Sequence, residues 1–115
     1  MDIKKFYELT GSDYQAALSI MMNDMLIERM INKFMDNNAY QSIVDAYEAN
    51  NIKEVFTQSH SFKGVTGNLA LTKLYQIASI LTEATRGKEE ASIADEIEQL
   101  KKDYLSIVEV YKSLK

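Results

Sequence analysis

A lone histidine, His60, is the side chain in this sequence best suited to chemistry at neutral pH. An unperturbed imidazole changes charge at about pH 6.5, so its neutral form offers a ring nitrogen as a base or nucleophile. The residue lies in the run SHSFKGVTGNL, residues 59–69. If this run is helical, Lys63 and Gly64 follow by three and four residues and share the surface of His60. The imidazole then has a cation and a patch of bare backbone beside it.

This arrangement suits a nucleophile that accepts and releases a phosphoryl group. A neutral ring nitrogen of His60 can attack phosphorus, and the Lys63 ammonium can offset the added negative charge. Gly64 has no Cβ, so a partner could approach the ring closely. A glycine inside a helix costs about 1 kcal/mol relative to alanine, which suggests that this approach is used. The alternative interpretation is that His60 and Lys63 are ordinary solvated residues of a helix surface.

A short motif around His60, with the helix that follows it, resembles the histidine-containing phosphotransfer (HPt) domain family. The residues that carry the resemblance are His60-x-Phe62-Lys63-Gly64-x-Thr66, Leu69 and the helix Leu74–Leu81. Domains of this family are four-helix bundles that take a phosphoryl group from the aspartate of a receiver domain and pass it to another, without kinase activity of their own. The resemblance implies that His60 is the phosphorylated residue, Lys63 the neighbouring cation and Gly64 the small residue beneath the ring.

Two positions depart from the family pattern. Where many members have Leu-Gly after the motif, this chain has Leu69 and Ala70, and the difference concerns the geometry of the turn. Where many members have Glu or Gln on the following helix, this chain has Thr82. The sequence therefore does not identify a group on that helix that orients the ring or the phosphate.

Composition favours a small helical domain and argues against several other classes. The chain has 115 residues, enough for one domain, with no proline and only four glycines, which favours helices over a many-turned β architecture. A net charge of −4 argues against nucleic-acid binding. No apolar run reaches the length of a membrane span and the N-terminus lacks a signal-peptide stretch, so we expect no membrane association and a cytoplasmic protein.

Metal and nucleotide chemistry are not expected of the chain itself. Without cysteine it has no thiolate nucleophile, and one imidazole with scattered carboxylates makes no case for a metal site. No Gly-rich nucleotide-binding loop occurs, so the chain should not phosphorylate itself from ATP. We predict no cofactor of its own and expect Mg²⁺ in the partner receiver domain.

Apolar residues repeat at helical spacing along most of the chain. The predicted helices cover about residues 13–22, 25–35, 43–47, 52–66, 71–86 and 93–114. Ser12, with Gln15, is predicted to cap the first of them, and Asn51, with Glu54, the fourth. Gly87 is predicted to end the helix 71–86.

The helix 52–66 carries the candidate site. Its predicted core side consists of Ile52, Val55, Phe56, Ser59, Phe62 and Thr66. The residues that cluster within about 100° of arc on an adjoining shoulder are His60, Lys63, Gly64 and Gly67. The ring of His60 should therefore be reachable from solvent. Gly67, with Asn68, is predicted to end the helix in the left-handed conformation, without a catalytic role.

The last two helices should complete the bundle. The helix 71–86 is predicted to bury Leu74, Tyr75, Ala78 and Leu81. The last helix has an apolar seam made of Ile93, Ile97, Leu100, Tyr104, Ile107, Tyr111 and Leu114. The short connection at 87–89 favours packing of this seam within one chain, and a coiled-coil dimer is the alternative.

Five of the six methionines lie between Met21 and Met35. Methionine fills gaps in cores and also serves as an adaptable contact residue. Core filling is the predicted role here. The alternative is that Met21, Met22 or Met25 is exposed and forms part of a surface that docks receivers.

We therefore predict one all-α domain over residues 1–115, an antiparallel four-helix bundle with one or two additional short N-terminal helices. Its predicted function is reversible phosphoryl transfer between His60 and receiver aspartates in a two-component phosphorelay. The expected partners are response-regulator receiver domains and a hybrid sensor histidine kinase, and the expected state is a monomer. The first alternative is a helical binding module that docks and inhibits a receiver domain or histidine kinase without being phosphorylated. The second is a structural protein that dimerises through its last helix.

Overall fold

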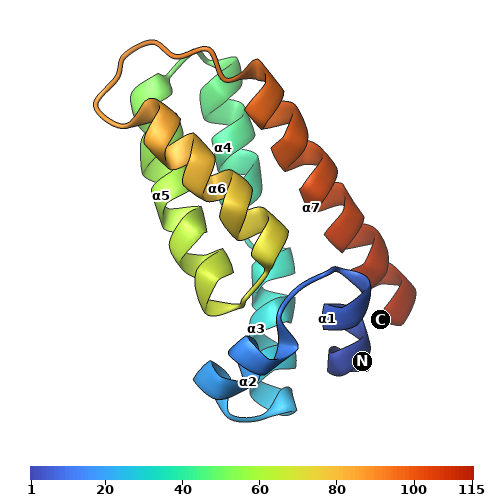
Figure 1. Ribbon diagram of the computed structural model, residues 1–115. Helices are drawn as coiled ribbons and strands as arrows, with labels where there is room; N and C mark the ends of the chain where they lie inside the picture. The colour runs from blue at the N-terminus through green and yellow to red at the C-terminus, as the bar shows by residue number, and fades with distance from the viewer.

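The protein is all-helical. The computed structural model describes residues 1–115 and contains seven helices and no strand (Figure 1). The helices are α1 (Ile3–Leu9), α2 (Tyr14–Met21), α3 (Asp24–Asp36), α4 (Ala39–Glu48), α5 (Ile52–Asn68), α6 (Thr72–Thr85) and α7 (Ala94–Leu114). None of these helices is both long enough and apolar enough to cross a membrane.

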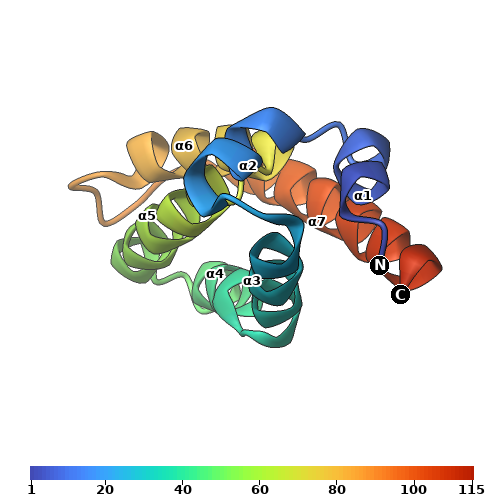
Figure 2. The ribbon, with the colours of Figure 1, turned by 90° about the horizontal axis from the view of Figure 1, so that it is seen from below.

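Four rods form the bundle, as predicted. Helices α5, α6 and α7 run antiparallel to one another in chain order, and α3 and α4 follow one another along the fourth side (Figures 1 and 2). The fourth rod is interrupted at Asn37, whose backbone is extended and whose side chain accepts a hydrogen bond from the Ala39 N–H at 2.9 Å. Helices α1 and α2 are the additional N-terminal helices and lie at the end of the bundle where α5 gives way to α6 (Figure 1).

One continuous cluster of 23 buried apolar side chains, drawn from all seven helices, forms the core. Phe62 of α5 packs on Phe34 of α3 with their ring centroids 5.7 Å apart. Tyr104 of α7 stacks on Tyr40 of α4 with a centroid separation of 3.9 Å. These contacts join α5 and α7 to the two halves of the fourth rod.

The apolar seam of α7 packs inside the chain. Its buried members are Ile93, Ile97, Leu100, Ile107 and Tyr111, and Tyr104 and Leu114 are partly buried against the core. The hydroxyl of Tyr111 donates a hydrogen bond to the side-chain oxygen of Asn32 on α3 at 2.6 Å. Because other helices of the same chain cover the seam, it is not available as the interface of a coiled-coil dimer.

One of the two predicted N-terminal caps is wrong. The carboxylate of Asp13, and not the hydroxyl of Ser12, caps α2 by accepting the Ala16 N–H at 3.0 Å. Aspartate caps as well as serine does, and the helix begins one residue later than a Ser12 cap requires. The cap of α5 is confirmed, since the side chain of Asn51 accepts the Glu54 N–H at 3.1 Å.

The end of α5 also differs from the prediction. Gly67 is helical, and the residue with the left-handed backbone is Ala70, at φ 53°. The Ala70 N–H donates to the Gly67 carbonyl at 3.1 Å, and the Leu71 N–H donates to the Thr66 carbonyl at 3.0 Å. This pair of bonds is the Schellman motif, which requires the left-handed residue three positions beyond Gly67. At the end of α6, Gly87 has φ 67°, as predicted for a terminating glycine.

Two predicted core residues lie nearer the surface than expected. Tyr75 is 40% exposed, because its ring lies across the surface of α5 over Gly67. A Cβ at Gly67 would come within 3.1 Å of two Tyr75 ring carbons, so the glycine permits this close packing of α6 on α5. Phe56 is half-buried, at the edge of the core face and against the ring of His60. The other predicted core residues of α5 are buried.

Some of the methionines between Met21 and Met35 fill the core and others are exposed. Met21, Met30 and Met35 are partly buried and pack against the core, as predicted. Met22 and Met25 are 78% and 75% exposed, so core filling is wrong for these two. Met22 lies in the turn between α2 and α3, with φ 76°, and Met25 lies in the first turn of α3.

Candidate functional site

His60 lies near the middle of α5, on the solvent side of the helix. Ser59 and Phe62, its neighbours on the core side, are fully buried and fix the rotation of the helix about its axis. The one aromatic neighbour of the imidazole is Phe56, one turn earlier, with ring centroids 5.7 Å apart and planes inclined by 34°. The side-chain hydrogen bonds of α5 involve Asn51, Thr57, Gln58 and Thr66 but not His60. Its ring nitrogens are therefore free to meet a partner.

Lys63 and Gly64 lie beside His60, one turn along α5. Lys63 is half-buried, and its charge helps lower the pKa of Glu83 on α6. Its charge therefore acts on the same surface as His60 and Glu83. Gly64 is exposed, and a Cβ built on it would have no atom within 4 Å. Internal packing does not require a glycine here, and the space beside the backbone of Gly64 is open.

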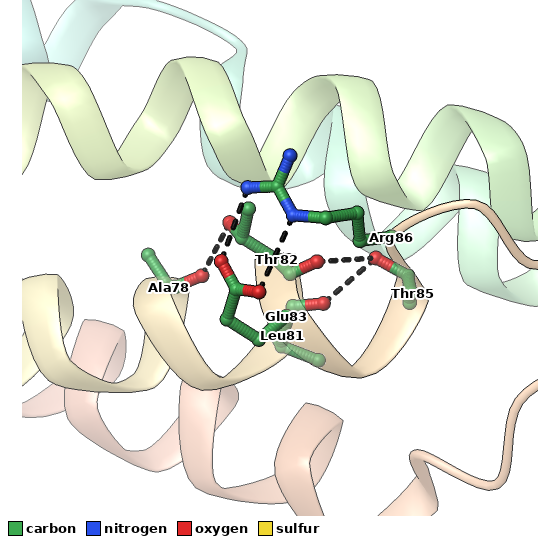
Figure 3. Close-up of polar contacts among 6 residues, drawn as sticks. All are labelled: Ala78, Leu81, Thr82, Glu83, Thr85 and Arg86. Carbon is green, nitrogen blue, oxygen red and sulfur yellow. Dashed lines mark hydrogen bonds and ion pairs between the residues drawn. The ribbon is translucent and has the colours of Figure 1, made fainter.

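Helix α6 contributes an ion pair to the same surface. Arg86 donates from Nη2 and Nε to the two carboxylate oxygens of Glu83, at 3.0 and 3.3 Å (Figure 3). The guanidinium carbon also lies 5.1 Å from the ring centroid of Phe56, in a cation–π position. The hydrogen bond and charge of Arg86 lower the pKa of Glu83, and the charges of Lys63 and His60 contribute in the same direction.

Glu83 and Arg86 were not among the predicted site residues. Their spacing of three on a predicted helix indicates a surface ion pair, but sequence spacing does not show which neighbouring helix that pair faces. The pair faces α5 because Thr82 and Thr85, on either side in sequence, are fully buried. Phe56 was assigned to the core and instead connects the histidine with the guanidinium.

Thr82, at the position where many members of the resembled family have Glu or Gln, does not face the imidazole. Its side chain is fully buried, and its hydroxyl donates to the Ala78 carbonyl at 2.7 Å within α6 (Figure 3). Thr85 is likewise buried and donates to the Leu81 carbonyl at 2.7 Å. The polar groups that α6 presents to the site are therefore those of Glu83 and Arg86.

The site consists of one exposed imidazole with two cations near it, and open space beside Gly64 on one side. No group of three or more histidine, cysteine, aspartate or glutamate side chains in the protein is placed to hold a metal ion. The arrangement can supply a nucleophilic nitrogen and can offset the charge of an anion bound to it. The three predicted site residues His60, Lys63 and Gly64 lie together on one face of α5.

Comparison with known protein families agrees with the helical fold. The family model described as Hpt domain matches residues 22–109, which include α3 to α6 and most of α7. No curated protein and no solved structure matches the chain significantly. Hpt domains are helical bundles of phosphorelays that interact with receiver domains and kinases. Because the match covers well over half of the residues, the chain belongs to the Hpt domain family.

Proposed function

We propose that this protein is a phosphotransfer intermediate in which His60 accepts a phosphoryl group from the aspartate of one receiver domain and passes it to another. The observation that carries the proposal is the state of His60 itself, which is exposed and free of internal hydrogen bonds on the helix that the Hpt family model includes. A histidine buried for a structural role would be expected to have a partner inside the fold. The proposed partners are response-regulator receiver domains and a hybrid sensor histidine kinase.

In the proposed reaction the lone pair of a neutral His60 nitrogen attacks phosphorus in line with the bond to the receiver aspartate. The N–P bond forms as the P–O bond breaks, and the electron pair of that bond returns to the aspartate carboxylate. The other ring nitrogen keeps its proton. Charge on the phosphoryl oxygens is offset by Lys63 from this side and by the receiver's own Mg²⁺ and basic residue from the other. The reverse step transfers the group to the next receiver.

Gly64 has a separate proposed role, which is to let the receiver surface approach the imidazole. In-line attack needs the reacting atoms about 3–3.5 Å apart, so the two backbones must come close. The open space at the missing Cβ supports this role, because no residue of this chain fills it.

Intact-mass analysis tests the proposal. Wild type and His60→Gln are incubated with phosphorylated receiver domains and Mg²⁺, and their masses are compared before and after acid treatment. We expect an acid-labile gain of one phosphoryl group on the wild type and none on His60→Gln. The matched control is Ser61→Ala, which removes an exposed hydroxyl next to His60 and should behave as the wild type.

Two results would contradict the proposal. A gain on His60→Gln equal to that of the wild type would place the phosphate elsewhere. If receivers bind both proteins and neither gains phosphate, the protein is a binding module that acts by occupancy. In that case His60→Gln would inhibit a receiver or kinase as well as the wild type does.

A further inference from the structure

One edge of the Arg86 guanidinium is hydrogen-bonded to Glu83, and the other edge makes no hydrogen bond. Nε and Nη2 donate to Glu83, so three of its five N–H groups are not committed to that pair, among them both on Nη1. In Figure 3 the third nitrogen of the guanidinium points away from Glu83. The hydrogen bonds of the guanidinium are those from Nε and Nη2, so Nη1 donates to no group of the protein. A planar fork with free donors is the geometry that recognises phosphate oxygens.

Phe56 links this guanidinium to the histidine. The Arg86 guanidinium carbon lies 5.1 Å and the His60 ring 5.7 Å from the centroid of the same phenyl ring. Glu83, which anchors the guanidinium, is close enough to His60 and Lys63 for both charges to lower its pKa. The pair from α6 and the imidazole from α5 therefore share one surface, over the boundary between the two helices.

The ion pair between Glu83 and Arg86 holds the guanidinium only weakly. The two side chains are 64% and 52% exposed, and exposed ion pairs are strongly screened by water. A phosphoryl group on His60 would bring close to two negative charges into this surface. It would attract the guanidinium and repel the Glu83 carboxylate, so the two anions would compete for one cation.

We propose that Arg86 is a second phosphate-binding cation for phosphorylated His60, and that Glu83 competes with the phosphoryl group for its guanidinium. The inference rests on the proposed phosphorylation of His60. Arg86 would contact the phosphoryl oxygens directly, whereas Glu83 acts through Arg86 and is a positioning residue. Before phosphorylation Glu83 holds the guanidinium against Phe56. After it, the free edge of the guanidinium turns to the phosphoryl oxygens and the pair with Glu83 loosens.

The ionisation of the phosphoryl group measures this competition. His60 is phosphorylated chemically with phosphoramidate, whose phosphoryl group moves to the ring nitrogen as ammonia leaves, and the ³¹P shift is titrated against pH. Removing a nearby cation should raise the pKa of the phosphoryl group, and removing a nearby anion should lower it. We expect Arg86→Ala to raise that pKa by about 0.2–0.7 pH units and Glu83→Gln to lower it by a similar amount.

Matched variants control for net charge and for folding. Arg29→Ala and Glu109→Gln make the same charge changes at exposed sites on α3 and α7, and should leave the titration as in the wild type. Arg86→Lys keeps the charge without the fork and should fall between wild type and Arg86→Ala. Thermal unfolding of each variant reports any loss of fold. A loss of fold would not shift the phosphoryl pKa in opposite directions for Arg86→Ala and Glu83→Gln.

The inference is overturned if Arg86→Ala titrates like Arg29→Ala, or if Arg86→Ala and Glu83→Gln shift the pKa in the same direction. Either result would leave receiver-dependent phosphorylation of His60 untouched. Conversely, a failure of every receiver to phosphorylate His60 would contradict the proposed function without altering the titration of the chemically phosphorylated protein. The two proposals therefore fail separately.

Discussion

Ser59 carries the one buried side-chain oxygen without a hydrogen-bond partner, directly beside the proposed phosphoacceptor. An unpaired buried hydroxyl costs about 1–3 kcal/mol in desolvation. We therefore predict that Ser59→Ala raises the free energy of unfolding by about 1 kcal/mol, measured by urea denaturation. Ser61→Ala makes the same change at an exposed position of α5 and controls for helix propensity. If Ser59→Ala gains no more than Ser61→Ala, the hydroxyl is not unpaired in solution.

Replacing Gly64 by alanine should increase the stability of the protein and reduce its phosphotransfer activity. Its missing Cβ faces open space, so Gly64→Ala should add about 1 kcal/mol of helix stability. The new methyl group should also slow phosphoryl transfer from a receiver, because it stands where the partner is proposed to approach. Phosphorylation by phosphoramidate, a small donor, should be unaffected. Equal transfer rates for Gly64→Ala and wild type would remove the proposed role of Gly64.

Among the residues of the candidate site, some were predicted from the sequence and others were not. His60, Lys63 and Gly64 were found because their types and their spacing of three and four residues already define one helix surface. Glu83 and Arg86 were not identified from the sequence, because their position depends on which face α6 turns toward α5. That face is set by the packing of α6 in the assembled bundle, which one sequence does not specify.

Among the elements, the turn between α5 and α6 has the clearest unfavourable backbone. Ala70 occupies a left-handed conformation, φ 53°, which costs a residue with a Cβ about 1–2 kcal/mol. Ala70→Gly should therefore raise the free energy of unfolding by about 0.5–1 kcal/mol, after the entropy cost of glycine in the unfolded chain. Ala49→Gly is the matched control, since Ala49 ends α4 with φ −82° and should be destabilised by glycine. A loss of stability in Ala70→Gly would contradict this account of the turn.

The same turn shows where helix prediction from sequence fails. Glycine is a common terminating residue, so Gly67 with Asn68 was the natural end for α5. The helix continues through Gly67 instead, where the absent Cβ leaves room for the Tyr75 ring, and the left-handed position falls on Ala70. Helices with long apolar repeats, such as α3 and α7, were predicted to within a few residues, because their pattern alone specifies the buried face.

For the whole molecule, the N-terminal helices are held to the bundle across the α5–α6 turn. The family match begins at residue 22, so α1 and α2 lie outside it. The Tyr7 hydroxyl of α1 is buried and donates to the Leu69 carbonyl at 2.6 Å. A short helix was predicted over residues 13–22, but the range of α1 was not predicted. The contact of Tyr7 spans 62 positions in sequence, so no local pattern predicts it.

Tyr7 should make the stability of the molecule depend on pH in the alkaline range. Burial raises the pKa of its phenol above the ordinary value, so the folded state favours the neutral form. The stabilisation is complete below the unfolded pKa of about 10 and is lost as the pH rises above it. Tyr7→Phe should lose about 1 kcal/mol at pH 7 and should show a shallower decline above pH 10, measured by urea denaturation.

Tyr75→Phe, at an exposed tyrosine, is the control for Tyr7→Phe and should follow the wild-type pH profile. The half-buried phenols of Tyr40 and Tyr104 also have pKa values raised by burial, and their contribution to the pH dependence of stability is the same in all three proteins. The difference between wild type and Tyr7→Phe therefore isolates Tyr7. Parallel alkaline profiles for these two proteins would contradict the assigned role of its hydroxyl.

The proposed function requires that phosphate pass through His60. The most direct test follows the phosphoryl group in time, by intact mass, from a phosphorylated donor receiver through this protein to a second receiver. We predict that the phosphorylated form of this protein rises and then falls as the second receiver gains phosphate, and that His60→Gln abolishes the transfer. Transfer through His60→Gln at the wild-type rate, or no phosphorylated form of the wild type while the second receiver gains phosphate, would contradict the account.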